Sequence, residues 1–203
     1  MNKQHKKRFS GFNLPEALAI IGVNQIKEWY FDITPRSPST HYQQTVAKLK
    51  LHFDLSLSEA AKSLLIDALL LEAIDDFKEL KIWKEAALQT DILTGTVDYL
   101  IAPQGKVYQS PLLCVVEAKK DNFEQGLAQC LVEMQACQWL NQISKPFEVF
   151  GIVTNAVVWQ FYQLTPENDV YESPVYAETQ LESILGILYS IFAQCTVNLT
   201  MKK

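Results

Sequence analysis

The sequence predicts an α/β fold, in which helices flank a mixed central β-sheet in the order α-β-β-β-α-β-β and further helices lie at both termini. Three observations lead to this prediction. A helical apolar period covers 57–80, three short apolar segments follow it, and a second helical stretch at 121–142 precedes two more apolar segments. The composition, 48% hydrophobic and 20% charged over 203 residues, is that of a globular protein with a substantial core.

The N-terminal region is expected to form a helix over 14–33. Apolar residues recur there with a loose helical period, and Pro15 stands in the first turn, where proline is tolerated. Residues 34–40 then have the proline and serine content of a loop. We therefore expect an N-terminal helical arm and linker over 1–40, followed by a single domain over 41–203.

The helix at 57–80 is marked by Ser56 and Glu59, which have the spacing of a capping box just before the apolar period. The segments that follow are typical of strands, because they are short and apolar and are separated by turn residues. These predicted strands are 81–84, 96–102 and 111–119. A Pro-Gln-Gly turn at 103–105 favours a hairpin between the last two, and the nearly continuous apolar run of the third predicts a central strand.

The second core helix begins near Asp121, where the spacing to Glu124 again resembles a capping box, and extends to about 142. Strands are expected at 147–154 and 157–162, and a final helix at about 178–194. The apolar arc of the final helix is broad, which predicts either deep packing or a surface that forms a homodimer.

Charge is unevenly distributed along the chain, whose net charge is −5. Residues 1–50 carry eight Lys and Arg against three Asp and Glu, whereas the remainder carries ten against twenty. The acidic remainder argues against unselective coating of nucleic acid. We expect the one local basic cluster, at 3–8, to be a solvated tail.

The four cysteines form no Cys-x-x-Cys pair, and the three histidines all lie near the start of the chain, so we expect buried free thiols without zinc or disulfides. No uninterrupted apolar run approaches the roughly 18 residues that span a bilayer. No apolar signal region follows the basic start. These features predict a cytoplasmic protein that does not enter a membrane.

Charged residues interrupt the two most apolar predicted strands. Glu117 and Lys119 are two residues apart, so they lie on the same face of the sheet, and Asp98 interrupts the preceding strand. If the hairpin register allows, Asp98 and Glu117 become neighbours across the ladder. Two partly buried carboxylates repel each other unless a cation lies between them. Oxygen ligands select Mg²⁺ or Mn²⁺, and Lys119 beside the ion would then orient the attacking water or neutralise charge on a phosphodiester.

This arrangement resembles the PD-(D/E)XK nuclease superfamily, which has the restriction-endonuclease-like fold. The matching segments are GTVDY at 95–99 and VEAK at 116–119, and the flanking element order extends the resemblance over roughly 56–163. The resemblance implies a magnesium-dependent nuclease in which Asp98, Glu117 and the main-chain carbonyl of Ala118 bind the metal and Lys119 is the catalytic lysine. Val97 stands where the family's name-giving proline would be.

Three further residues fit the family pattern less closely. Many members place a glutamate on the first core helix, and Glu72 continues the apolar stripe of the helix at 57–80. Glu72 is therefore a further expected metal ligand, or else it lies where the apolar stripe simply reaches the surface. Some relatives use a glutamine on the helix after the lysine. Gln125 and Gln129, four residues apart, are expected to contact substrate phosphate, to support Lys119, or to form a solvated face.

Alternatives to an active nuclease remain open. Lys119 with Glu117 or Asp98 could be a structural ion pair, and the same fold can serve as a non-catalytic module that binds nucleic acid or protein. The intact set of Asp98, Glu117 and Lys119 favours an enzyme that cleaves nucleic acid, with DNA expected. A third alternative is a structural subunit that assembles through the face containing Cys130 and Cys137 and through the apolar C-terminal helix.

Overall fold

The computed structural model describes residues 6–119, 122–141 and 147–200. Five α-helices are present in this part of the chain: α1 (Leu14–Ile21), α2 (Thr40–His52), α3 (Glu59–Ile74), α4 (Phe123–Asn141) and α5 (Leu181–Thr200). Its strands are β1 (Lys7–Arg8), β2 (Lys27–Glu28), β3 (Leu80–Gln89), β4 (Leu93–Pro103), β5 (Cys114–Ala118), β6 (Val149–Thr154), β7 (Val158–Leu164), β8 (Val170–Glu172) and β9 (Tyr176–Ala177).

All of these strands belong to one mixed sheet. The order along its main path is β1-β4-β5-β6-β7-β8-β2, while β3 also pairs with β4 and β9 with β7. The β3–β4 and β4–β5 pairs are antiparallel, whereas β5 and β6 are parallel and are connected through α4. The predicted α/β class with a mixed sheet and flanking helices is therefore confirmed.

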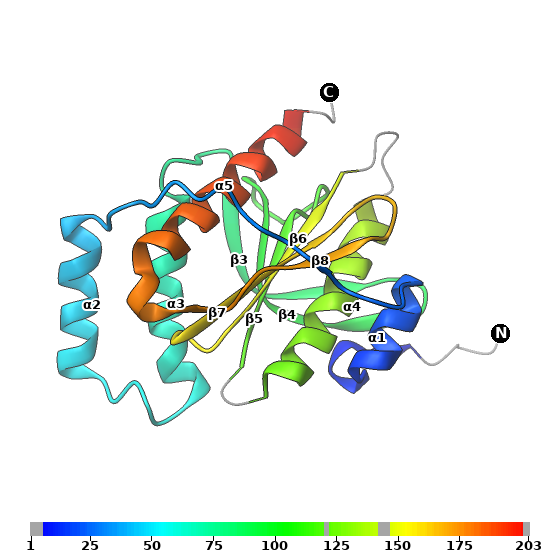
Figure 1. Ribbon diagram of the computed structural model, residues 1–203, viewed down its shortest axis with the longest axis horizontal. Coiled ribbons are helices and arrows are strands. Elements are labelled where there is room, and N and C mark those ends of the chain that lie inside the picture. Colours follow the sequence, from blue (N-terminus) through cyan, green and yellow to red (C-terminus); the bar gives the residue numbers. More distant parts are fainter. Residues whose placement is uncertain (1–5, 120–121, 142–146, 201–203) are drawn as a thin grey trace.

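Helices cover both faces of the sheet (Figure 1). On one face, α1 and α4 pack through an apolar cluster that includes Ile21, Leu131 and Val115. On the other face, α3 and α5 pack through a cluster that includes Leu70 and Leu188. Outside this second layer lies α2, which contains no buried residue and packs beside α3.

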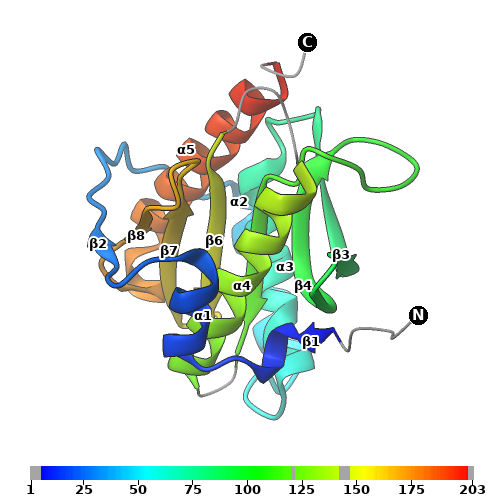
Figure 2. The same cartoon turned by 90° about the vertical axis from the view of Figure 1, so that its right-hand side faces the viewer.

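The N-terminal region differs from the predicted single helix over 14–33. Helix α1 ends at Ile21 because Gly22 adopts a left-handed conformation, with φ of 88°, and its main-chain nitrogen bonds back to Leu18. The chain then continues as an extended segment in which β2 pairs with β8. Residues before α1 pack into the core as well: Phe9 is 1% exposed, and Figure 2 shows β1 near β4.

Other boundaries also differ from the predicted ones. Helix α3 is capped by Ser58 rather than Ser56, because the Ser58 hydroxyl accepts a hydrogen bond from the main-chain nitrogen of Ala61. Strand β3 is ten residues long, far longer than 81–84, and β8 and β9 lie outside every predicted strand. Helix α2 was also absent from the predicted elements. Asp121, the expected cap of the second core helix, lies outside the described residues.

The last helix has the composition of a membrane-spanning segment as well as that of a core helix. The stretch Glu178–Thr200 is long enough to cross a bilayer and has a mean hydropathy of 1.4 over its most apolar window, half of which is buried. Ile184, Leu188 and Phe192 lie within the cluster between α5 and the sheet. The apolar arc noted in the sequence thus serves, at least on its inner side, to cover the sheet.

Candidate functional site

The register of the β4–β5 hairpin brings Asp98 next to the carboxyl end of β5. The last ladder pair is Tyr99 with Val116, so the next residues of the two strands are Asp98 and Glu117. Beyond this pair, Oδ2 of Asp98 accepts a hydrogen bond of 2.8 Å from the main-chain nitrogen of Ala118. The structure therefore brings Asp98, Glu117 and Ala118 together, on adjacent strands.

Glu117 and Lys119 form an ion pair on one face of β5. Lys119 Nζ lies 2.6 Å from Glu117 Oε1, and the glutamate side chain is only 1% exposed whereas the lysine side chain is 23% exposed. The second oxygen of Glu117, Oε2, is buried without a hydrogen-bond partner among the described residues. The main chain at this point is fixed by a hydrogen bond from the Lys119 nitrogen to the carbonyl of Thr154 on β6.

Helix α4 adds two polar side chains to this ion pair. Lys119 Nζ donates to Gln129 Oε1 at 3.3 Å, and Gln129 Nε2 donates to Glu133 Oε1 at 3.0 Å. Gln129 and Glu133 are four residues apart, so they share one face of the helix. Glu133 is fully buried, although α4 is otherwise packed mainly through apolar residues.

A glycine permits the close approach of α4 to the lysine. A Cβ atom at Gly126 would lie 2.9 Å from Cγ of Lys119 and 3.0 Å from Cγ1 of Val153, closer than side chains normally pack. The absence of a side chain at Gly126 lets the aliphatic part of Lys119 lie against the helix. The ammonium group can then reach Gln129 and Glu117.

Burial and mutual repulsion raise the pKa values of the carboxyl groups. Burial, with the charge of Asp98 added to it, raises the pKa of Glu117 to about 7 despite the opposing effect of Lys119. Burial and the charge of Glu117 raise the pKa of Glu133 well above its ordinary range. Burial also raises the pKa of Asp98, against its hydrogen bond from Ala118 and the charge of Lys119.

The lysine remains a cation in this setting. Burial alone would lower the pKa of Lys119, but the charge and hydrogen bond of Glu117 and the charge of Asp98 outweigh burial and raise it. Glu133 also interacts with Glu117, whose charge adds to the effect of burial in raising the pKa of Glu133. The site therefore combines one ammonium group with carboxyl groups that repel each other.

Two more carboxylates, Glu59 and Glu85, act on Asp98 through their charge. Glu85 lies opposite Asp98, between two regular pairs of the β3–β4 ladder, and adopts φ of 53°, which is unusual for a residue with a side chain. Glu59, in the first turn of α3, and Glu85 both raise the pKa of Asp98 through their charge. The region around Asp98 is thus strongly acidic, which favours binding of a cation.

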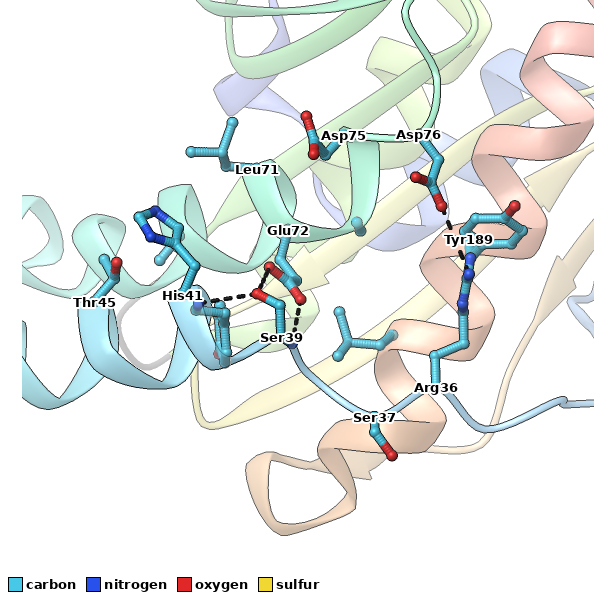
Figure 3. A pocket seen from close by; sticks show the side chains of 14 residues that line it. Arg36, Ser37, Ser39, His41, Thr45, Leu71, Glu72, Asp75, Asp76 and Tyr189 are labelled. Carbon is cyan, nitrogen blue, oxygen red and sulfur yellow. Dashed lines mark hydrogen bonds and ion pairs between the residues drawn. The ribbon is translucent and has the colours of Figure 1, made fainter.

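The structure does not bring Glu72 to this site. Its carboxylate accepts hydrogen bonds from the main-chain nitrogen and the hydroxyl of Ser39, at 2.6 and 2.8 Å, at the start of α2 (Figure 3). Glu72 also lies thirteen residues after Glu59 on the same helix, a rise of about 20 Å along the axis. The structure therefore places Glu72, the further expected metal ligand, at the contact between α3 and the start of α2, apart from the other expected ligands.

The two glutamines that were expected at the site, Gln125 and Gln129, have different contacts. Gln125 Nε2 donates to the carbonyls of Ser10 and Phe12, at 3.2 and 3.1 Å, so it anchors the N-terminal segment. Gln129 does contact Lys119, and it borders a cavity of about 370 Å³ that is lined by residues of the N-terminal segment and β4, including Arg8, Phe9 and Thr96. Only Gln129 lies where substrate or lysine support was expected.

Three residues near the site, Glu133, Glu59 and Glu85, are not predicted as site residues from the sequence. Glu59 was assigned only a capping role. The one sequence signal for Glu133 is its position four residues after Gln129 on a helix that is otherwise apolar along most of its faces. The signal for Glu85 is its position on a strand that extends beyond the segment predicted at 81–84.

The donors present at this site suit a hard divalent cation. Within the described ranges, no group of three or more His, Cys, Asp and Glu side chains has the arrangement of a metal site. Magnesium, however, commonly binds through one or two carboxylates and retains water molecules. Asp98 and the unpartnered Oε2 of Glu117 supply such a pair. No protein-family model and no curated protein matches the chain.

Proposed function

We propose that this protein is a magnesium- or manganese-dependent nuclease that hydrolyses phosphodiester bonds in nucleic acid, with DNA as its substrate. The observation that carries the proposal is the meeting of Asp98, in the middle of β4, with Glu117 and Lys119 at the carboxyl end of β5. Two carboxylates with an adjacent ammonium group can hold a divalent ion and stabilise the negative charge of a phosphoryl group.

The element order supports a restriction-endonuclease-like core. Helix α3 precedes three antiparallel strands, β3 to β5, and α4 then leads to β6, which is parallel to β5. We propose that this core, which includes the β4–β5 hairpin with Asp98 and Glu117 and also Lys119, is that of a PD-(D/E)XK-type nuclease.

Each residue has a proposed role in the reaction. Asp98, Glu117 and the carbonyl of Ala118 hold the metal ion, which supplies Lewis-acid activation of water and of the scissile phosphate. Lys119 is held as a cation by Glu117 and Asp98, so its role is to neutralise charge that develops on the phosphoryl oxygens. Gln129 supports the lysine through its side-chain oxygen.

A second candidate is a non-catalytic module that binds nucleic acid or protein on the same fold. The observation that favours it is the burial of Glu117, whose Oε1 is already paired with Lys119 at 2.6 Å. Such a contact also suits a structural ion pair. The two candidates differ in whether a divalent ion binds and whether cleavage depends on it.

The deciding experiment incubates the purified protein with Mg²⁺ or Mn²⁺ and with supercoiled, linear and single-stranded DNA and RNA. Asp98→Ala and Lys119→Ala should each abolish cleavage. Asp75→Ala and Lys78→Ala are the matched controls, because these residues form an exposed ion pair just after the end of α3. They should cleave at the wild-type rate.

The outcomes separate the candidates. Cleavage that persists in both site variants would indicate a contaminant and remove the assignment. If nothing is cut, calorimetry with Mn²⁺ decides: binding that is lost in Asp98→Ala would support the metal site and leave the substrate to be found. A chain that neither cuts nor binds Mn²⁺ would support the non-catalytic module.

A further inference from the structure

Glu133 is a buried carboxyl group to which neither the proposed reaction nor the resemblance assigns a role. It is fully buried on α4, and the neighbouring core residues of that helix include Cys130, Met134 and Cys137. A carboxyl group in such surroundings costs free energy that an apolar side chain of similar size would not. This cost requires an explanation in terms of what Glu133 contacts.

The contact of Glu133 with Gln129 determines which end of the glutamine amide faces Lys119. Gln129 donates through Nε2 to Glu133 Oε1 at 3.0 Å, which leaves Oε1 of Gln129 to accept from the ammonium group at 3.3 Å. The reversed amide would direct an NH₂ group at the lysine and an oxygen at the glutamate carboxyl, and both contacts would become less favourable. Lys119, which can only donate, and an acceptor at position 133 therefore select the same orientation from opposite ends of the amide.

We propose that Glu133 is a positioning residue, which fixes the side-chain amide of Gln129 so that its oxygen faces Lys119 and limits where the ammonium group can lie. This inference rests on the proposed nuclease function for its catalytic meaning, but the orientation of Gln129 can be measured without any activity. Lys119 is then held from two sides, by Glu117 at 2.6 Å and by Gln129.

Two variants of Glu133 test the proposal in the full chain. Glu133→Leu has similar size and no polar group, so it removes the acceptor. Glu133→Gln can still present an oxygen to Gln129 Nε2. Val132→Ala is the matched control, because Val132 is a neighbouring buried residue whose truncation perturbs the same helix without a polar contact to the site.

The first measurement is the exchange of the Gln129 side-chain amide protons by nuclear magnetic resonance, with the signal assigned by its loss in Gln129→Ala. Wild type, Glu133→Gln and Val132→Ala should show protected amide protons. Glu133→Leu should lose this protection while melting at the wild-type temperature or above, because a buried carboxyl has been replaced by an apolar group. Unchanged protection in Glu133→Leu would overturn the proposal.

The second measurement is cleavage kinetics. Glu133→Leu should lower kcat by about ten- to a hundredfold with little change in KM, because a hydrogen bond to a charged group is weakened while nucleic-acid contacts remain. Glu133→Gln should recover most of kcat. A Glu133→Leu protein that cuts at the wild-type rate would overturn the catalytic part of the proposal. If the wild type cuts nothing, the nuclease assignment fails, and amide exchange alone decides whether Glu133 positions Gln129.

Discussion

The carboxylate of Asp98 is hydrogen-bonded to the neighbouring strand: its Oδ2 accepts from the main-chain nitrogen of Ala118 at 2.8 Å. This bond is made just beyond the last regular pair of the β4–β5 ladder, where β4 goes on pairing with β3 and β5 with β6. One oxygen of Asp98 is thereby fixed in position relative to β5. The position of the Asp98 carboxylate relative to β5, and hence to Glu117, therefore depends on the register of the β4–β5 hairpin.

Asp98→Asn should abolish cleavage without weakening the fold. The amide oxygen can still accept from Ala118, but the negative charge is lost, so metal binding and cleavage should fall by at least about a hundredfold. Because burial raises the pKa of Asp98, its ionised form destabilises the folded state at neutral pH, and its removal should leave the melting temperature equal or higher. Calorimetry without divalent ions provides the check. A marked drop in melting temperature would contradict this reading.

Stability without divalent ions should fall as pH rises through about 7. The pKa of Glu117 is raised from 4.5 to about 7 in the folded state, so the folded chain binds this proton more tightly than the unfolded chain. Its contribution is fully present below about pH 4.5 and is lost as pH rises through about 7. Urea unfolding of wild type and Glu117→Gln between pH 5 and 8 measures the effect, and the variant should have the flatter profile. Parallel profiles would exclude the shift.

Glu72→Ala should weaken the fold modestly and leave cleavage unchanged. Glu72 receives two hydrogen bonds from Ser39, whose hydroxyl also caps α2 by accepting from Tyr42. The free energy of unfolding should fall by about 1 kcal/mol in Glu72→Ala and in Ser39→Ala, and by less than the sum in the double variant. Loss of metal-dependent cleavage in Glu72→Ala would restore it as a candidate ligand.

Gly95→Ala should displace the N-terminal segment. A Cβ atom at this position would clash with the ring of Phe9, a side chain that is 1% exposed. We expect a loss of about 1–3 kcal/mol in unfolding free energy. Phe9→Ala removes the clash, so in that background the Gly95→Ala change should cost much less. Additive losses in denaturant unfolding would show that the two residues do not interact.

The sequence predicted the central part of the site because strand geometry is local. Alternation put Glu117 and Lys119 on one face, and the hairpin register then brought Asp98 to Glu117. Glu133 was not identified because twelve residues of α4, on nearly all its sides, are buried, so no polar stripe marks the side that meets β5. Its role depends on the packing of α4, which the sequence does not encode locally.

Other differences have comparable causes. Glu72 lies on an apolar stripe of α3, but its partner is α2, whose lack of buried residues also gave the helix little periodic signal. In the N-terminal region, Gly22 ends α1 because it takes the left-handed conformation at the cap, although the apolar period of the sequence continues beyond it. The boundaries of β3 depend on pairing with β4 through nine of its ten residues, and pairing partners are decided by the tertiary fold.

The connection through α4 also determines when the site is completed during synthesis. The antiparallel hairpin of β4 and β5 can form from neighbouring residues, so a growing chain can bring Asp98 and Glu117 together early. Lys119 becomes fixed only after α4 has emerged and β6 has paired with β5, because its main-chain nitrogen bonds Thr154 and its ammonium group meets Gln129. In nascent chains that stop before residue 154, Lys119 would therefore lack its main-chain partner, and the arrangement of Asp98, Glu117 and Lys119 would be completed only when β6 pairs with β5.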